Sequence, residues 1–316
     1  MKKRRLGNIG LELSPVVLGS TYFGTAVSKE DAFLQMDTYR AHGGNVLDTA
    51  PSYGIGASEQ VIGEYLKSRQ CRQEIVISSK AGHPHFEDFH KGRLSHAEIE
   101  ADIDMGLLRL GVSHIDILWL HRDDPNRSVE EILDTLCAMV KKGKILEFGF
   151  SNWSFERIAA ANAYATAHQM PTCVASQIQW SLAECVRMQD DTLVMMDSRQ
   201  ERFYQETGMP VFAFSSQAKG FFEKYHQNSL AGKAKERYLA EENVMRYQRL
   251  LEISQETGLS LSALSLAYLL AEETFDVYPI IGASRPEQLA DSMQILTEEI
   301  PKKIRRWRSE DGAICR

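Results

Sequence analysis

The sequence predicts an α/β protein of the (β/α)8 TIM-barrel class, with an N-terminal β-hairpin and long loops at the C-terminal face of the barrel. Three observations support this. About eight short apolar runs recur along the chain, helix-like segments separate them, and polar residues stand where several runs end. Such alternation is typical of a parallel sheet covered on both faces. We expect a single domain, residues 1–316, because barrels commonly reach this length.

The first expected element is a small hairpin. Residues 3–13 (KRRLGNIGLEL) place Gly7 and Asn8 between two short alternating stretches, which indicates a tight turn. We expect this hairpin to cover the floor of the barrel.

Eight apolar runs follow the hairpin. Most lack the alternation of polar and apolar residues seen in half-exposed sheets, so they are expected to be parallel strands buried on both sides. The predicted strands are residues 15–20, 45–50, 74–79, 115–120, 145–150, 173–180, 209–215 and 277–282.

Four segments between these strands carry clear helix signals. The first starts after Ser28, an N-cap residue. Two others have a capping box, in which a serine is followed three residues later by a glutamate: Ser95 with Glu98, and Ser128 with Glu131. The four predicted helices are residues 28–43, 95–111, 128–143 and 154–168.

Composition restricts the functional class. The net charge of −7 and the 25% of charged residues are ordinary for a soluble protein and give no sign of nucleic-acid binding. The five cysteines form no CxxC or Cys/His zinc spacing, so we expect no metal site. Asn8, Glu12 and Pro15 interrupt the apolar stretch behind the basic start, and no apolar run approaches the ~18 residues of a membrane helix. We therefore expect a cytoplasmic protein without membrane contact, whose oligomeric state stays open.

Four polar residues stand at the ends of consecutive strands. Asp48, Lys80 and His121 lie at the ends of three successive runs. Tyr53 lies in the loop that follows the run of Asp48. A barrel gathers such strand ends around one cavity. Taken singly, each residue has an ordinary explanation as a turn cap, a loop residue, a solvated charge or a strand-end polar group. Together they suit proton transfer to a carbonyl oxygen, because an ammonium beside a tyrosine stabilises its phenolate.

The segment NVLDTAPSYGIGASEQVIGEYL, residues 45–66, resembles the DTA…YG…SE…G signature of the aldo-keto reductase family. The resemblance extends from residue 18 to residue 289. It implies that Asp48, Tyr53, Lys80 and His121 are the catalytic tetrad. It further implies that a nicotinamide exchanges hydride with a small carbonyl or alcohol substrate, and that Tyr53 acts as the general acid or base.

The cofactor site is expected at the barrel mouth, since the chain has no GxGxxG fingerprint. The resemblance implies that Ser151, Asn152 and Gln177 hold the nicotinamide carboxamide and that Phe214 stacks on the ring. Arg285 stands before a predicted helix, whose N-terminus is a ready anion site. The resemblance implies that this region holds the 2′-phosphate, so we expect NADP(H) to be preferred, with NAD(H) as the alternative. The full predicted set is Gly19, Ser20, Thr21, Asp48, Ser151, Asn152, Gln177, Phe214, Ser215, Gly220, Gly282, Ser284, Arg285, Gln288, Asp291 and Ser292. Asp291-Ser292 departs from the family's common Glu-Asn pair.

The substrate pocket is expected to contain Tyr22, Tyr53 and His121. Tyr22 takes the place of a tryptophan that several family members carry after the first strand. His83, His85 and His90 follow the third strand and suggest a hydroxyl-rich substrate such as a sugar or polyol.

Two further expectations concern the surroundings of the pocket. Strand alternation favours Trp119 facing the helices rather than the barrel interior. The polar segment 221–247 forms either a solvated helix pair or a mobile lid.

Two other functions stay open from the residues alone. The chain could be an NADP(H)-binding regulatory module with slow or vestigial redox activity. It could also be a lyase that uses Lys80 to form a Schiff base. An intact Asp48, Tyr53, Lys80 and His121 set favours the redox enzyme.

Overall fold

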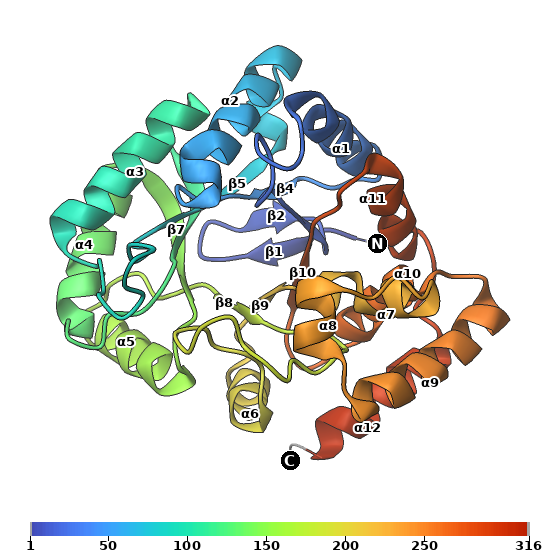
Figure 1. Ribbon diagram of the computed structural model, residues 1–316. Coiled ribbons are helices and arrows are strands. Elements are labelled where there is room, and N and C mark those ends of the chain that lie inside the picture. Colours follow the sequence, from blue (N-terminus) through green and yellow to red (C-terminus); the bar gives the residue numbers. More distant parts are fainter. Residues whose placement is uncertain (1, 315–316) are drawn as a thin grey trace.

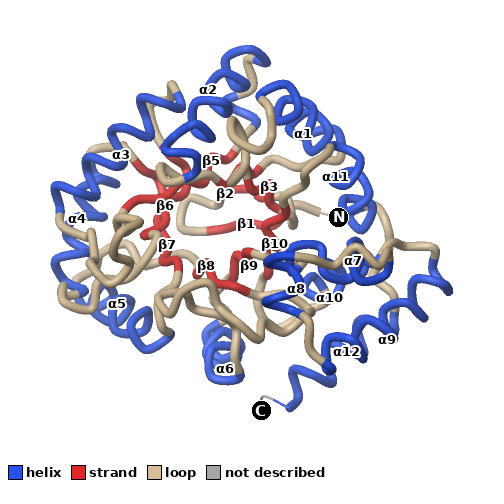
Figure 2. The backbone as a smooth tube through the Cα atoms, viewed as in Figure 1, coloured by secondary structure: helices blue, strands red, loops and turns tan. Residues whose placement is uncertain are grey.

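The computed structural model describes residues 2–314, so Cys315 lies outside the described part. Eight parallel strands close a barrel in the order β10-β3-β4-β5-β6-β7-β8-β9. Helices surround this ring of strands (Figures 1 and 2). The strands are β3 Val17–Gly19, β4 Val46–Asp48, β5 Val76–Ala81, β6 Ile115–Leu120, β7 Ile145–Ser151, β8 Ser176–Gln179, β9 Val211–Phe214 and β10 Val277–Ile281. The predicted barrel and its eight apolar runs are confirmed.

The N-terminal hairpin is also confirmed. Strand β1 (Arg4–Leu6) pairs antiparallel with β2 (Leu11–Leu13), and the two cross the ring of strands in Figure 1. Leu6 and Leu13 pack into the barrel interior against residues such as Val17 and Val46. The hairpin therefore covers one end of the barrel and leaves the other end for chemistry.

The four predicted helices form where their caps indicate. The Ser28, Ser128 and Ser154 side chains each accept a hydrogen bond from a backbone N–H in the first turn, and Ser95 forms the complete capping box with Glu98. The helices are α1 Lys29–Ala41, α2 Ala57–Arg69, α3 His96–Leu110, α4 Val129–Lys141, α5 Phe155–Ala167, α6 Ser198–Thr207, α7 Phe221–His226, α8 Gly232–Tyr238, α9 Glu241–Thr257, α10 Leu261–Leu270, α11 Pro286–Met293 and α12 Lys302–Ile314. Short 3-10 turns lie at η1 Tyr53–Gly56, η2 Arg72–Glu74, η3 Ala218–Gly220 and η4 Gln294–Leu296.

Segment 221–247 is largely helical: it forms α7, α8 and the beginning of α9. Phe221, Phe222 and Tyr238 are buried within it, which ties the segment to the protein core. The segment is thus helical, but it comprises more than one helix pair and is partly buried instead of fully solvated.

Trp119 lies inside the barrel, so the expectation that it faces the helices was wrong. Its ring packs 4.8 Å from that of Phe212 in the inner core cluster. The neighbouring strand contributes Gly149, at which a Cβ would come within 2.3 Å of the Trp119 ring. The missing side chain of Gly149 therefore makes the space that the indole fills.

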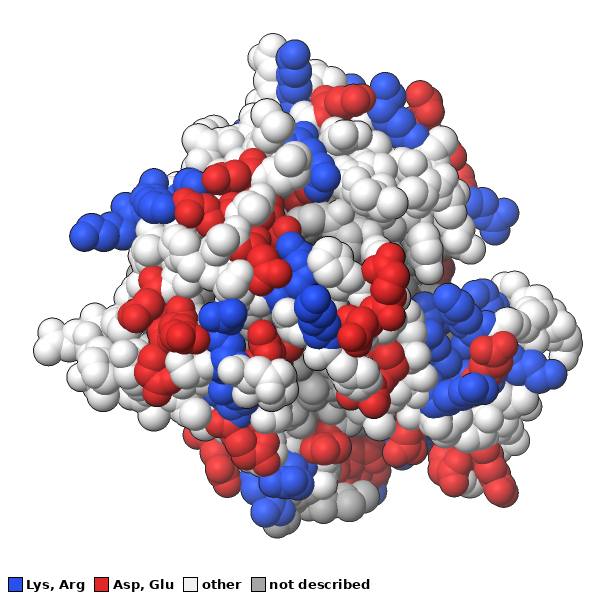
Figure 3. Space-filling model, turned by 60° about the vertical axis from the view of Figure 1, so that its left-hand side comes forward, with Lys and Arg blue, Asp and Glu red and all other residues white. Residues whose placement is uncertain are grey.

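Acidic and basic side chains are interspersed over most of the face drawn in Figure 3. Among residues 2–314, no helix combines the length and the apolar character that crossing a membrane requires.

Candidate active site at the carboxyl ends of the strands

Lys80 and Asp48 form the buried centre of the candidate site. Asp48 ends β4 and Lys80 is the fifth residue of β5. The Lys80 Nζ lies 2.5 Å from Asp48 Oδ1 and also donates to the Thr49 carbonyl at 2.9 Å. Burial lowers the pKa of Lys80, but the interactions with Asp48 and Tyr53 have the larger combined effect, so the pKa is raised. Lys80 is therefore a fixed ammonium at neutral pH.

A tight turn brings Tyr53 back to this ammonium. Gly54, Ile55 and Gly56 follow Tyr53 with φ values of 57°, 56° and 90°. The left-handed region is unfavourable for a β-branched residue, and Ile55 is also 83% exposed. As a result the Tyr53 ring centroid lies 5.0 Å from Lys80 Nζ. Local strain beside a reactive group is typical of a functional site.

His121 follows β6 and completes the group. Its ring lies 6.0 Å from that of Tyr53 and 4.6 Å from that of His83, both edge to face. His121 is buried, and its Nδ1 has no hydrogen-bond partner among the described residues. Burial, and then Arg122, His83 and Lys80, lower the pKa of His121 well below its usual value. The imidazole is therefore neutral at neutral pH and can donate one hydrogen bond to a ligand oxygen.

A neutral buried histidine predicts a loss of stability in mild acid. The unfolded chain takes up a proton on His121 near pH 6.5, whereas the folded chain does not until a much lower pH. The free energy of unfolding should therefore fall as the pH drops below about 6.5, by up to about 1.4 kcal/mol per pH unit for this group. Urea unfolding at pH 7.0 and 5.5 measures the loss, and His121→Gln should lessen it. An equal loss in both proteins would contradict the assignment.

Three residues around Asp48 extend the site into the barrel. Ser78 Oγ donates to Asp48 Oδ2 at 2.9 Å, and Gln177 Nε2 donates to the same oxygen at 3.0 Å. Trp119 Nε1 in turn donates to Ser78 Oγ at 2.6 Å. No sequence pattern singles out Ser78. Gln177 binds Asp48 in addition to the role that the resemblance implies.

Asn152 holds the backbone beside His121. It adopts a φ of 59°, and its Nδ2 donates to the His121 carbonyl at 3.1 Å and to Ser151 Oγ at 3.0 Å. The Asn152 Oδ1 accepts the Val194 N–H at 3.1 Å. Ser151 and Asn152 therefore lie next to His121, but the Asn152 side chain already forms hydrogen bonds within the protein.

The predicted residues of the first loop divide into buried and exposed ones. Ser20 is buried, and its hydroxyl lies 2.8 Å from the Asp48 carbonyl and 2.6 Å from Ser58 Oγ. At Gly19 a Cβ would meet Ile280 at 2.8 Å. Thr21 and Tyr22 are exposed. Of the three residues predicted for the substrate pocket, His121 lines the cavity described below, whereas Tyr22 and Tyr53 do not.

The predicted residues after β9 lie near a group of cations. Phe214 ends β9 half-buried, Ser215 follows with a φ of 53°, and Gly220 precedes α7 with a φ of 74°. Burial lowers the pKa of Lys219, and Arg237, Lys233 and Lys224 lower it further. Three cationic side chains thus surround Lys219, the residue before Gly220: Lys224, Lys233 and Arg237.

The last predicted group surrounds the start of α11. Gly282, Ser284, Arg285 and Gln288 are exposed, and the Ser284 N–H donates to Gln288 Oε1 at 3.1 Å. Asp291 is half-buried. Ser292 is buried instead, and its hydroxyl accepts from Gln217 Nε2 at 2.9 Å. The exposed members of this group, Arg285 above all, are available to an anionic ligand.

A cavity of about 250 Å³ opens beside Lys80 and His121. Ile55, Phe86 and Met105 give it an apolar rim, and all three are exposed. His83 and His85 line it too, whereas His90 points elsewhere and approaches Asp191 at 3.3 Å.

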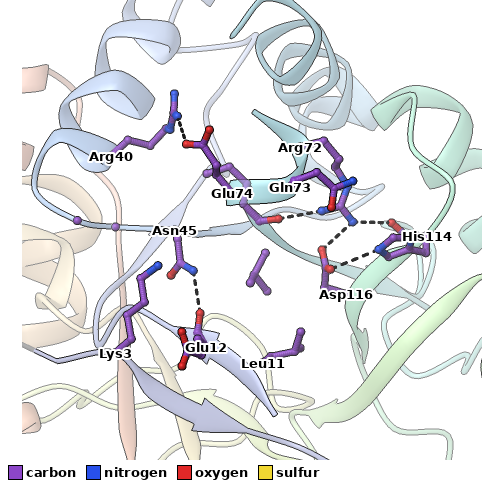
Figure 4. Close-up of a pocket in the computed structure, with 14 residues that line it drawn as sticks. Lys3, Leu11, Glu12, Arg40, Asn45, Arg72, Gln73, Glu74, His114 and Asp116 are labelled. Atoms are coloured by element: carbon purple, nitrogen blue, oxygen red, sulfur yellow. Dashed lines mark hydrogen bonds and ion pairs between the residues drawn. The ribbon is translucent and has the colours of Figure 1, made fainter. Parts of the chain in front are cut away.

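A larger cavity of about 570 Å³ lies beside the hairpin, where β4, β5 and β6 begin. Figure 4 shows that several of its charged residues pair with one another: Arg40 binds Glu74, and Arg72 binds Asp116, which His114 also approaches. Lys80 and His121 lie toward the other end of the strands and line the smaller cavity, which is therefore the candidate active site.

Comparisons with known proteins agree with this geometry. The model of the Aldo/keto reductase family matches residues 15–309. A norsolorinic acid reductase of Emericella nidulans is 28% identical over 306 residues, which cover 92% of this chain and 76% of the relative. An aldo-keto reductase of Aspergillus calidoustus is 29% identical, over 91% and 76% of the two chains. An aryl-alcohol dehydrogenase of Pestalotiopsis microspora is 26% identical, over 92% and 76%.

Proposed function

The chain belongs to the aldo/keto reductase family, and we propose that it is a nicotinamide-dependent carbonyl reductase that works with Asp48, Tyr53, Lys80 and His121. It would reduce aldehyde or ketone groups of small molecules to alcohols, or catalyse the reverse reaction. The observation that carries the proposal is the tyrosine held 5.0 Å (ring centroid) from a buried ammonium that an aspartate fixes in place.

Each residue has a separate part in this reaction. When bound, the reduced nicotinamide supplies the hydride that the carbonyl carbon accepts. The Tyr53 hydroxyl gives its proton to the carbonyl oxygen and recovers one from solvent afterwards. Lys80 stabilises the phenolate left behind, and Asp48 keeps Lys80 charged and in place. Neutral His121 donates a hydrogen bond that orients the carbonyl oxygen.

The charge of Lys80 argues against the lyase alternative. Schiff-base formation requires a neutral amine as the nucleophile. The contacts of Lys80 with Asp48 and Thr49 and its raised pKa keep it protonated instead.

The donors at the barrel mouth fit a phosphorylated dinucleotide. Ser151, Asn152 and Gln177 offer amide and hydroxyl groups close to Asp48 and His121. The cations around Lys219 suit a diphosphate, and Arg285 before α11 suits a further phosphate. This distribution favours NADP(H) over NAD(H).

Replacing Arg285 with alanine is expected to weaken NADPH binding by about tenfold, because one charge-assisted contact to the 2′-phosphate is lost. NADH has no such phosphate, so its affinity should change little. Fluorescence titration of the wild type and of Arg285→Ala with both cofactors measures the effect. Tighter binding of NADH than of NADPH by the wild-type protein would contradict the NADP(H) preference.

The cavity wall favours aromatic carbonyl substrates. Ile55, Phe86 and Met105 present apolar surface, and the Phe86 ring lies 5.2 Å from that of His83. Two of the relatives are named for norsolorinic acid and aryl alcohols. A sugar or polyol is the second candidate, and the polar edges of His83 and His85 in the cavity favour it.

NADPH oxidation across aryl aldehydes, alkyl aldehydes, ketones and aldoses tests the proposal. We expect the highest kcat/KM for aryl aldehydes or ketones. A clear preference for aldoses would favour the second candidate, and no oxidation with any carbonyl compound would reject reductase activity in favour of the regulatory module.

A further inference from the structure

We propose that Trp119 and Ser78 are positioning residues that orient the Asp48 carboxylate and, through it, the Lys80 ammonium beside Tyr53. This inference rests on the proposed function, since it assigns these residues a part in the same reaction. It extends the site from the barrel mouth into the packed interior.

The chemistry of the indole fixes the direction of the hydrogen bonds. An indole N–H only donates, so the Ser78 hydroxyl must accept from Trp119 Nε1, 2.6 Å away. The single Ser78 proton is then available to Asp48 Oδ2 at 2.9 Å. Asp48 Oδ1 faces the other way and accepts from Lys80 Nζ. One carboxylate thus joins the interior network to the catalytic ammonium.

Strand register makes these contacts possible. Ser78 pairs with Asp48 across β4 and β5, and Lys80 pairs with Trp119 across β5 and β6. Ser78 and Lys80 are two residues apart on one strand, so both side chains point to the same face. All four residues are therefore neighbours on the inner surface of the barrel.

The indole has no freedom to leave this position. Trp119 is fully buried, packs on the Phe212 ring and fills the space at Gly149. The Ser78 hydroxyl, held between this fixed donor and the Asp48 carboxylate, is restricted to one orientation. Without the Ser78 hydroxyl, Gln177 and Lys80 remain as side-chain donors to the Asp48 carboxylate, which can then rotate. Small displacements of catalytic groups have large effects on rate.

Ser78→Ala and Trp119→Phe test the inference. Both should lower kcat by about tenfold, with KM changed by less than about twofold, because substrate contacts are preserved. A carboxylate that loses a donor attracts the ammonium more strongly and draws it away from Tyr53. The alkaline limb of the kcat/KM profile for reduction should then move upward by about 0.5 pH unit. Ser78→Thr, which keeps a hydroxyl, should restore the wild-type limb.

Ser79→Ala is the matched control, because Ser79 is equally buried on β5 but donates to Glu59 instead of Asp48. It should leave the pH profile in place. An independent readout is the Trp119 indole N–H signal in NMR spectra, identified by its loss in Trp119→Phe, which should shift upfield in Ser78→Ala. If wild-type protein reduces carbonyls but Ser78→Ala behaves like Ser79→Ala, the inference is overturned alone. If the wild type reduces no carbonyl, the proposed function fails and the inference with it.

Discussion

Tyr53→Phe is expected to lower kcat for carbonyl reduction by about 10²–10⁴-fold, the usual contribution of a general acid. The variant keeps the ring that lies 6.0 Å from His121 but has no proton to give. NADPH affinity should stay within about twofold, because the proposed cofactor donors are other residues. Single-turnover kinetics together with a fluorescence titration measure the two quantities separately.

Tyr164→Phe is a suitable control for this change. Tyr164 lies on α5, and its ring is tilted against that of His168, with centroids 4.0 Å apart. It is far in the sequence from Tyr53. It should lose neither turnover nor cofactor binding. Wild-type turnover by Tyr53→Phe would show that another group supplies the proton.

Lys80→Met is expected to remove both activity and stability. The substitution leaves the Asp48 carboxylate buried without its cation, and breaking a buried pair in this way typically costs about 3–5 kcal/mol. Turnover should fall at least about 100-fold, since the phenolate of Tyr53 loses the neighbouring charge. Urea unfolding and NADPH oxidation measure the two losses.

The double variant Asp48→Asn with Lys80→Met separates the two effects. Removing both charges should recover much of the stability, because no unpaired carboxylate is left, but it should recover no activity. If Lys80→Met alone is as stable as the wild type, Asp48 must form a compensating contact with another residue. Recovered turnover in the double variant would mean that the ammonium is not needed.

Much of the fold could be predicted because its signals are local. Apolar runs without alternation identify buried parallel strands, and the Ser95–Glu98 capping box identifies the start of α3. Helix α2 carries weaker signals: its N-cap is Gly56, which makes no side-chain cap. It was therefore not among the helices that the sequence identified.

The proposed catalytic residues could be singled out from the sequence, because each lies at or near the carboxyl end of a predicted strand or in the loop after it. What the sequence could not show depends on contacts across strands. The orientation of Trp119 depends on the gap at Gly149, a residue of the neighbouring strand. The hydrogen bonds that Ser78, Gln177 and Ser20 direct to Asp48 depend on register in the same way. The loop after β5 carries His83, His85 and His90, but only the first two line the cavity. Their spacing in the sequence does not indicate which of them face it.

The most direct measurement is a crystal structure with NADP⁺ and an unreactive aromatic carbonyl compound. We expect the carbonyl oxygen to lie about 3 Å from both the Tyr53 hydroxyl and a ring nitrogen of His121. The nicotinamide should lie beside Asn152 and Gln177. A carbonyl oxygen bound away from Tyr53, with Lys80 no longer paired with Asp48, would contradict the proposed roles of Tyr53 and Lys80.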